Sequence, residues 1–337
     1  LNIAIGELAL GAGVVTSINN IAIGTTSMDA LTSGHHNTAI GTNALGAATT
    51  GCLNVALGYL ALGAGVTTGS SNIAIGNSPA DALTTGLRNV AIGQDALGAS
   101  TTGCNNVALG YLALGAGVTT GIDNIALGTT AMDALTTGIC NVAIGTNALG
   151  ASTTGVRNIA IGELAMGTGV AIIGGGACGC DNIAIGKSAL SALTQGSNNI
   201  AIGLTAMDAI TTGTNNVAVG AYALGAAVTG VRNVAIGWCA LATNADDGGD
   251  YNIAIGDTAM ADCTGAAQDN IGIGRVALRK IRTGDDNIAI GGFSADALTT
   301  GACNVAIGTN ASGAATTGCR NIAIGELAMG TGVTIIG

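Results

Sequence analysis

The sequence predicts an all-β fold, a parallel β-solenoid of about 19 turns with 17–18 residues in each turn. Three observations support this. The 337 residues include 58 Gly but only one Phe, one Trp, one Pro and four Tyr, so a conventional core of large side chains is not expected. A pentapeptide pattern, Asn-x-Ala-x-Gly, recurs at a nearly constant interval. β-Branched residues flank the alanine in most copies, as is typical of a pleated strand.

The Asn that opens each copy defines the repeat. Of its eighteen spacings, twelve are 17 residues, four are 18, one is 19 and one is 24. We therefore expect residues 1–337 to be one continuous array, and a piece of a longer protein, with a bulged insertion at 170–181. The nineteen opening residues are Asn2, Asn20, Asn37, Asn54, Asn72, Asn89, Asn106, Asn124, Asn141, Asn158, Asn182, Asn199, Asn216, Asn233, Asn252, Asn270, Asn287, Asn304 and Asn321.

Each copy contains a short β run followed by a corner. In the first copy Ile3 and Ile5 favour a strand, and Gly6 permits a backbone conformation that a Cβ would resist. A second short run around Ala-Leu or Met-Asp-Ala-Leu follows, and Thr-Thr-Gly closes many of the copies. Stacking the copies at a strand spacing of roughly 4.8 Å places the Asn residues above one another. We expect their side-chain amides to form a hydrogen-bonded ladder.

The middle residue of the β run is Ala in eighteen copies and Gly272 in the remaining one. Because side chains alternate along a strand, Ala4 and its two neighbours point to opposite faces, and both faces are apolar. Only one face of a thin coil can look inward. We expect the flanking Ile and Val to face the interior and the Ala column to form a tight seam between parallel protomers, in a homotrimer or filament. The alternative is that Ala fills a narrow corner of a monomeric coil.

The repeat also resembles a known family. Asn20-Ile-Ala-Ile-Gly24 and Asn37-Thr-Ala-Ile-Gly41 resemble the head repeats of trimeric autotransporter adhesins, and the resemblance covers essentially the whole chain. The variant with Thr-Thr-Gly before the Asn, as in residues 84–89, also resembles repeats of phage tail fibres. The resemblance implies a left-handed β-roll, a homotrimer, and binding to a host surface, matrix or glycan receptor. The period is longer than in adhesin heads, and Cys is more frequent.

Charge and hydropathy exclude two classes of partner. Nineteen Asp and Glu oppose nine Lys and Arg, and the net charge of −10 would repel the phosphates of a nucleic acid. No apolar run reaches the ~18 residues of a membrane helix, because Gly or Asn interrupts every few positions. We expect neither nucleic-acid binding nor a membrane span in this segment.

Two sets of acidic residues are candidate cation sites. Asp246, Asp247 and Asp250 lie in one enlarged loop beside two Gly, which makes them the candidate Ca²⁺ ligands, with an acidic surface loop as the alternative. The second set recurs in the corner of the repeat, where copies three turns apart are separated by roughly 14 Å, too far to share an ion. We expect these to be solvated turn residues: Asp29, Asp81, Asp133, Asp208 and Asp296.

Other polar side chains give weaker signals. Residues 275–282 place four basic side chains in one turn, and we expect pairing with Asp285 and Asp286, with a polyanion or carbohydrate contact as the alternative. His35 and His36 are the only two His, and the sequence fixes no Ser, Cys or carboxylate beside them. No catalytic triad is therefore expected.

The nine Cys contain no Cys-x-x-Cys pair, so a zinc site of that type is not implied. Cys303 and Cys319 precede the Asn of adjacent turns, where a bridge would be within reach. Cys52 and Cys104 are three turns apart and out of reach of each other. We expect most of the nine to be free buried thiols.

These features predict a non-enzymatic structural protein, a fibre or adhesin shaft for surface attachment or filament formation, located outside the cell, at the cell surface or in a virion fibre. No catalytic residue and no cofactor other than Ca²⁺ is expected. One alternative is a phage tail-fibre shaft for host recognition. The other is an ice-binding solenoid, although adjacent Thr residues point to opposite sides, so each turn offers one outward Thr.

Overall fold

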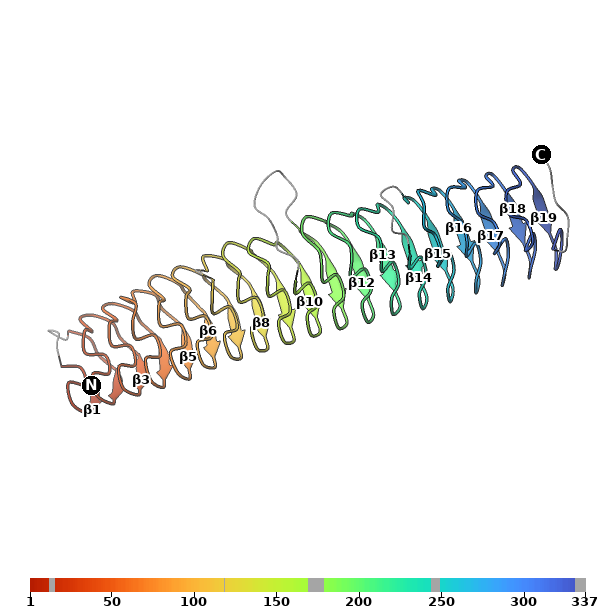
Figure 1. Ribbon diagram of the computed structural model, residues 1–337. Helices are drawn as coiled ribbons and strands as arrows, with labels where there is room; N and C mark the ends of the chain where they lie inside the picture. The colour runs from red at the N-terminus through yellow and green to blue at the C-terminus, as the bar shows by residue number, and fades with distance from the viewer. Residues whose placement is uncertain (12–15, 118, 169–178, 244–248, 331–337) are drawn as a thin grey trace. The chain divides into compact units, whose positions relative to one another are not determined.

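The computed structural model describes residues 1–11, 16–117, 119–168, 179–243 and 249–330. The chain divides into two compact units, the first containing Leu1–Gly167 and the second containing Thr168 and the described residues from 179 onward. The described residues form three-residue strands joined by turns, and none of them is helical. Figure 1 labels those strands for which there is room, numbered in chain order. The bulge predicted at 170–181 lies mostly outside the described residues and stays a prediction.

The N-terminal unit stacks ten parallel strands in chain order, one for each repeat. Equivalent residues pair across neighbouring strands, so Ala22 lies beside Ala39 and Ala39 beside Ala56. The strands are β1 (Ile3–Ile5), β2 (Ile21–Ile23), β3 (Thr38–Ile40), β4 (Val55–Leu57), β5 (Ile73–Ile75), β6 (Val90–Ile92), β7 (Val107–Leu109), β8 (Ile125–Leu127), β9 (Val142–Ile144) and β10 (Ile159–Ile161).

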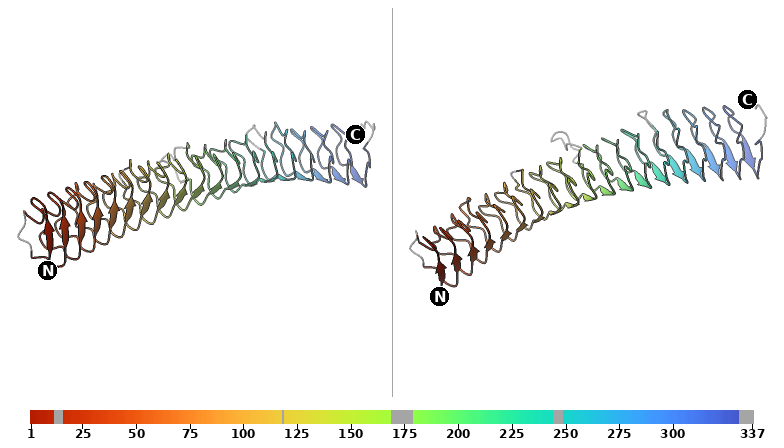
Figure 2. Two further views of the ribbon diagram at one scale, coloured as in Figure 1. Left: turned by 90° about the horizontal axis from the view of Figure 1, so that it is seen from below. Right: turned by 60° about the horizontal axis from the view of Figure 1, so that its bottom comes forward.

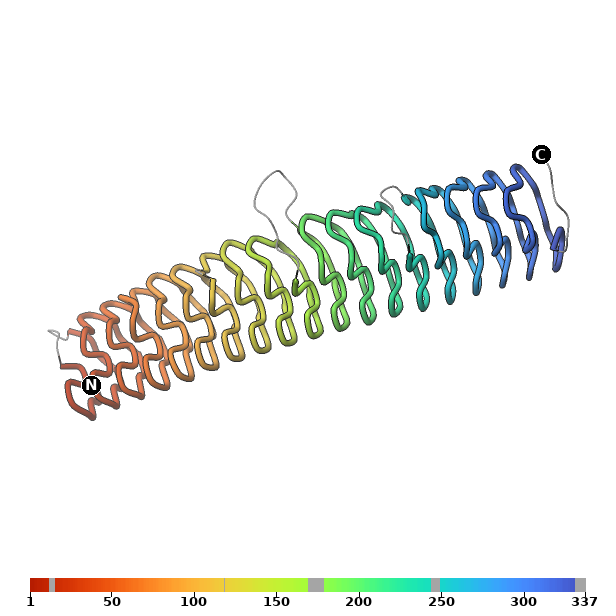
Figure 3. Tube along the Cα trace, viewed as in Figure 1, coloured from red at the N-terminus to blue at the C-terminus, as the bar shows by residue number. Residues whose placement is uncertain are grey.

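The C-terminal unit repeats this arrangement with nine strands. Gly272 replaces the central Ala and pairs with Ala254 and Ala289 without a change of register. Within each unit the strands lie in one row along one side (Figure 2), and each repeat makes one coil (Figure 3). The predicted parallel solenoid is therefore confirmed. The strands are β11 (Ile183–Ile185), β12 (Ile200–Ile202), β13 (Val217–Val219), β14 (Val234–Ile236), β15 (Ile253–Ile255), β16 (Ile271–Ile273), β17 (Ile288–Ile290), β18 (Val305–Ile307) and β19 (Ile322–Ile324).

The central Ala of each strand points into the coil, which reverses the expected orientation. Ala108 and Ala126 are fully buried, whereas Val107 and Ile125 beside them are 38% and 42% exposed. The central residue is buried in every strand from β2 to β19. The predictions that Ile and Val face the interior and that Ala forms a seam between protomers are therefore wrong. The alternative assignment, Ala as the filler of a narrow coil, is correct.

The second short run of each repeat, around Ala-Leu or Met-Asp-Ala-Leu, forms a turn that fills the rest of the interior. After β7, Leu112 and Leu114 have φ of 52° and 51°, in the left-handed region, which costs about 1–2 kcal/mol for each residue. Leu114 is fully buried, and burying such a side chain contributes about 1.5–3 kcal/mol, enough to offset the cost of its own backbone conformation. Gly110 starts the corner with φ of 135°, and a Cβ there would lie 2.6 Å from the carbonyl oxygen of Gly128.

The predicted Asn ladder is confirmed and runs through the buried edge of each coil. The Asn141 backbone N–H and side-chain Nδ2 both donate to Oδ1 of Asn124, at 3.0 Å each. Nδ2 also donates to the Gly155 carbonyl at 2.7 Å, and Asn141 Oδ1 accepts the Asn158 N–H at 3.0 Å. Within each unit, each amide therefore meets the next one along the stack. A buried amide without partners would cost about 1–3 kcal/mol, and the ladder avoids that cost in every turn.

The orientation of the strands can be tested with two neighbouring residues. Ala126→Leu adds methylenes to a filled interior, and we expect it to lower the free energy of unfolding by about 1–3 kcal/mol. Ile125→Leu lies on the outer face and conserves volume, so its effect should stay below about 1 kcal/mol. Urea unfolding followed by far-ultraviolet circular dichroism would measure both, and a larger effect at position 125 would contradict the inward placement of Ala.

Candidate functional site, an exposed apolar strand face

The outer face of the strands carries two parallel columns of apolar side chains. In the N-terminal unit every flanking strand position is Ile, Val or Leu except Thr38, and none is charged. Neighbouring turns cover the sides of these residues but not their ends, so Leu109 and Leu127 remain 40% and 38% exposed. The C-terminal unit has only Ile and Val at the equivalent positions. We call these paired columns the strand face.

The strand face is large for a surface left in water. Nine of the twenty flanking side chains in the N-terminal unit are 36–59% exposed, and the other eleven are partly exposed. Together they leave on the order of 1,000 Å² of largely apolar surface in contact with water. Single soluble chains rarely leave apolar patches of more than a few hundred Å² exposed. A surface of this size and chemistry is typical of a protein interface rather than of a solvated face.

The Thr-Thr-Gly corner divides its two hydroxyls between the backbone and the solvent. Thr84 Oγ1 donates to the Thr101 carbonyl in the next turn at 2.9 Å, while Thr85 is exposed. Each turn therefore presents one outward Thr, and the array is one side chain wide. In the N-terminal unit the exposed Thr occurs in six successive turns, at Thr50, Thr68, Thr85, Thr102, Thr120 and Thr137.

Of the three candidate calcium ligands, only Asp250 lies among the described residues, and Asp246 and Asp247 lie outside them. Asp250 Oδ1 accepts the backbone N–H of Val231 at 2.7 Å, so this carboxylate already binds the preceding turn. Among the described residues no group of three or more His, Cys, Asp and Glu side chains is placed to hold a metal ion. The calcium loop stays a prediction.

The five recurring corner Asp residues are all half-buried, so they are less solvated than expected, and four of them have a raised pKa. Burial is the largest effect and raises the pKa of each carboxyl, since the charged form loses hydration. Backbone hydrogen bonds oppose this rise, as Ala134 does for Asp133. At Asp296 the charges of Lys280 and Arg279 also oppose it. The four residues are Asp81, Asp133, Asp208 and Asp296.

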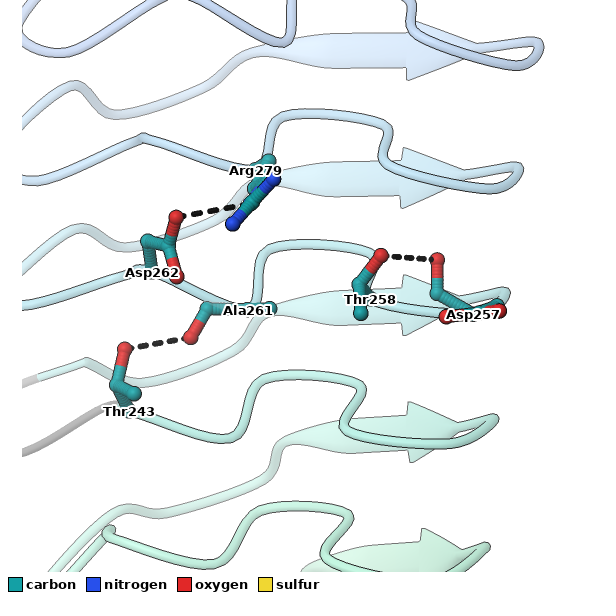
Figure 4. Close-up of polar contacts among 6 residues, drawn as sticks. All are labelled: Thr243, Asp257, Thr258, Ala261, Asp262 and Arg279. Carbon is teal, nitrogen blue, oxygen red and sulfur yellow. Dashed lines mark hydrogen bonds and ion pairs between the residues drawn. The ribbon is translucent and has the colours of Figure 1, made fainter.

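The basic turn forms contacts with neighbouring turns, but its ion pair is not the expected one. Arg279 Nε lies 2.8 Å from Asp262 Oδ2 in the preceding turn (Figure 4). Asp285 Oδ1 instead accepts the backbone N–H of Gln268 at 2.8 Å. Figure 4 also shows the Thr243 hydroxyl donating across turns to the carbonyl of Ala261. Because the ion pair is partly exposed, its contribution to stability is about 0–1 kcal/mol.

Most of the aromatic side chains occupy the same corner position in their different repeats, a feature that the sequence analysis missed. They occupy the first or second position after the glycine that ends a strand, and all but Phe293 are exposed. The Arg275 guanidinium lies 4.6 Å from the centre of the Phe293 ring, a cation–π contact. Aligning the repeats would have revealed that these residues share one position. These residues are Tyr59, Tyr111, Tyr222, Trp238 and Phe293.

The cysteines are more exposed than expected. In the described part of the chain Cys180 and Cys263 are buried, whereas the other six cysteines are half-buried or exposed. Cys180 is disulfide-bonded, whereas Cys303 and Cys319 are both free, so no bridge links those two turns. Cys52 Sγ lies 3.0 Å from His35 Nδ1, a contact that the 17-residue spacing of the two residues could have indicated.

Comparisons with known proteins assign no family to this arrangement. No protein-family model matches the chain, and no curated protein matches it either. The described part of the chain contains no helix of the length and apolarity that crossing a membrane requires. The function is therefore inferred from the shape and chemistry of the described surface.

We expect the half-buried carboxyls to make the stability of the folded state depend on pH. Their folded pKa lies above the ordinary value of 3.8, so between these two values the folded state binds more protons than the unfolded state. The stabilisation is full below the ordinary value and is lost as the pH rises through the folded pKa. We expect Asp133→Asn to raise the thermal midpoint at pH 7 more than at pH 4. Calorimetry at both pH values would measure this, and equal shifts would contradict it.

Proposed function

We propose that the chain is a non-enzymatic structural shaft, part of a fibre or adhesin, that assembles side by side with parallel copies of itself. The observation that supports this most directly is the exposed strand face, which is uncharged throughout each unit and apolar except at Thr38. Burying it requires no charge to be desolvated, so the usual penalty for covering a surface is small. Gaining about 25 cal/mol for each Å² of apolar area favours association.

A second copy is the partner that fits this face best. The side chains repeat along the stack at roughly the strand spacing of 4.8 Å, and a parallel copy repeats at the same interval. The side chains of one copy can therefore pack between those of the other in the same way over all ten turns of the N-terminal unit. A globular partner has no such period and would match only a few turns. The proposed seam runs along the Ile, Val and Leu columns rather than the Ala column.

Three strand faces meeting around an axis would bury one another along their length, which is the homotrimer that the resemblance to trimeric adhesins implies. The same resemblance would make the coil left-handed and place the protein outside the cell, on a bacterial surface or in a phage tail fibre. In either setting the proposed role of the shaft is surface attachment or filament formation. Ice binding has weaker support, because the exposed Thr array is only one side chain wide.

The proposal predicts that the wild-type chain assembles at micromolar concentration. Multi-angle light scattering should give a multiple of the chain mass of 32.0 kDa, with three copies expected. Leu109→Lys combined with Leu127→Lys should shift the mass to 32.0 kDa, because buried like charges would face each other across the seam. The circular dichroism spectrum should stay unchanged, since both residues point outward.

Tyr111→Lys is the matched control. It removes an exposed apolar side chain from the same region of the stack but not from the strand face. This variant should assemble like the wild type. A folded, monomeric wild-type chain would overturn the proposal, and loss of assembly in Tyr111→Lys as well would move the seam away from the strand face.

A further inference from the structure

Two side chains with metal-binding chemistry meet on consecutive turns of the N-terminal unit. His35 and Cys52 each lie two residues before the Asn of their repeat, at Asn37 and Asn54, so stacking places one above the other. Cys52 Sγ lies 3.0 Å from His35 Nδ1. His35 is exposed and Cys52 is half-buried, so both are open to solutes. The strand face and the proposed assembly do not use this pair.

The pair has the right atoms and spacing for a borderline-soft divalent ion. Imidazole nitrogen and thiolate sulfur are the ligands that Zn²⁺ prefers, with bond lengths of about 2.0–2.1 Å and 2.3 Å. Tetrahedral bonding to one ion would separate the two ligand atoms by roughly 3.6 Å. The observed separation therefore needs to open by only roughly 0.6 Å, which a small side-chain rotation supplies at an exposed site.

We propose that His35 Nδ1 and Cys52 Sγ form a two-ligand binding site for Zn²⁺. The neutral imidazole binds through the lone pair on Nδ1, and the Cys52 S–H bond gives its proton to solvent as the S–Zn bond forms. His36 is directed elsewhere, since its Nε2 lies 3.2 Å from Asn19 Nδ2. Water fills the remaining positions, so the ion exchanges readily. The bound ion links two adjacent turns that are also joined by backbone hydrogen bonds and by the bond from the Asn54 N–H to Asn37 Oδ1.

The chain contains its own control for this site. Cys104 occupies the same position in the repeat, and its Sγ lies 3.5 Å from the Thr102 carbonyl, as Cys52 Sγ lies 3.4 Å from that of Thr50. Both cysteines are half-buried. They differ in the residue one turn before, which is Leu87 for Cys104 and His35 for Cys52. Any Zn²⁺ effect that depends on the pair should appear at Cys52 and not at Cys104.

Alkylation of the full chain by N-ethylmaleimide, followed by mass spectrometry of the peptides, tests the site. Micromolar Zn²⁺ should slow alkylation of Cys52 by about tenfold or more, because the metal-bound sulfur is a poorer nucleophile than the free thiolate, while Cys104 should change by less than about twofold. His35→Gln should abolish the protection of Cys52. Leu87→His should transfer protection to Cys104.

Co²⁺ gives a second readout that does not depend on alkylation. The wild-type chain should show near-ultraviolet sulfur-to-cobalt charge-transfer absorption that Cys52→Ser removes, with an unchanged circular dichroism spectrum. Equal Zn²⁺ protection of Cys52 and Cys104, or protection of Cys52 that persists in His35→Gln, would overturn the proposal. A monomeric chain in light scattering would refute the assembly but leave this result unaffected, because both ligands belong to one chain.

Discussion

The hydrogen bond from one buried Asn to the next is the constraint on which the rest of each unit depends. A coil this thin has a corner that water does not reach, and the backbone amide there needs a partner. An Asn side chain supplies an acceptor to the following turn and two donors to its surroundings, so one residue type satisfies the same corner in every repeat. Asn141 shows the complete pattern, with Asn124 on one side and Asn158 on the other. The period of the chain follows from keeping these amides in line.

A narrow interior follows from the same geometry. The strand contributes Ala, the corner contributes Ala and Leu or Met, and little else fits between them. The corner reaches inward only by placing residues such as Leu114 in the left-handed region, and the burial of their side chains offsets the backbone cost. The large side chains of the corner thus fill the interior, and the branched residues of the strand remain outside. An exposed apolar face is therefore a direct product of how the coil is filled.

The sequence predicted the period, the parallel strands and the Asn ladder, because each depends on what recurs and on spacing alone. It did not predict which strand face points inward. Ala126 and its neighbours Ile125 and Leu127 are all apolar, so alternation gave no polar side to mark the solvent. The overlooked signal was volume, since the Leu and Met of the corner also need interior space. Cross-turn contacts such as His35 with Cys52, and the burial of Asp133, depend on what lies one turn away, which becomes clear only when repeats are compared column by column.

The direction of the Asn ladder has an electrical consequence. In the N-terminal unit every ladder bond points the same way, with the side-chain oxygen of one turn accepting from the turn that follows. Aligned amide dipoles add, as they do along an α-helix, and they polarise one another when the bonds form a continuous chain. Such a stack has a donor-rich end and an acceptor-rich end. Two stacks joined end to end would therefore match head to tail and not head to head, which gives a polymer of these coils an intrinsic polarity.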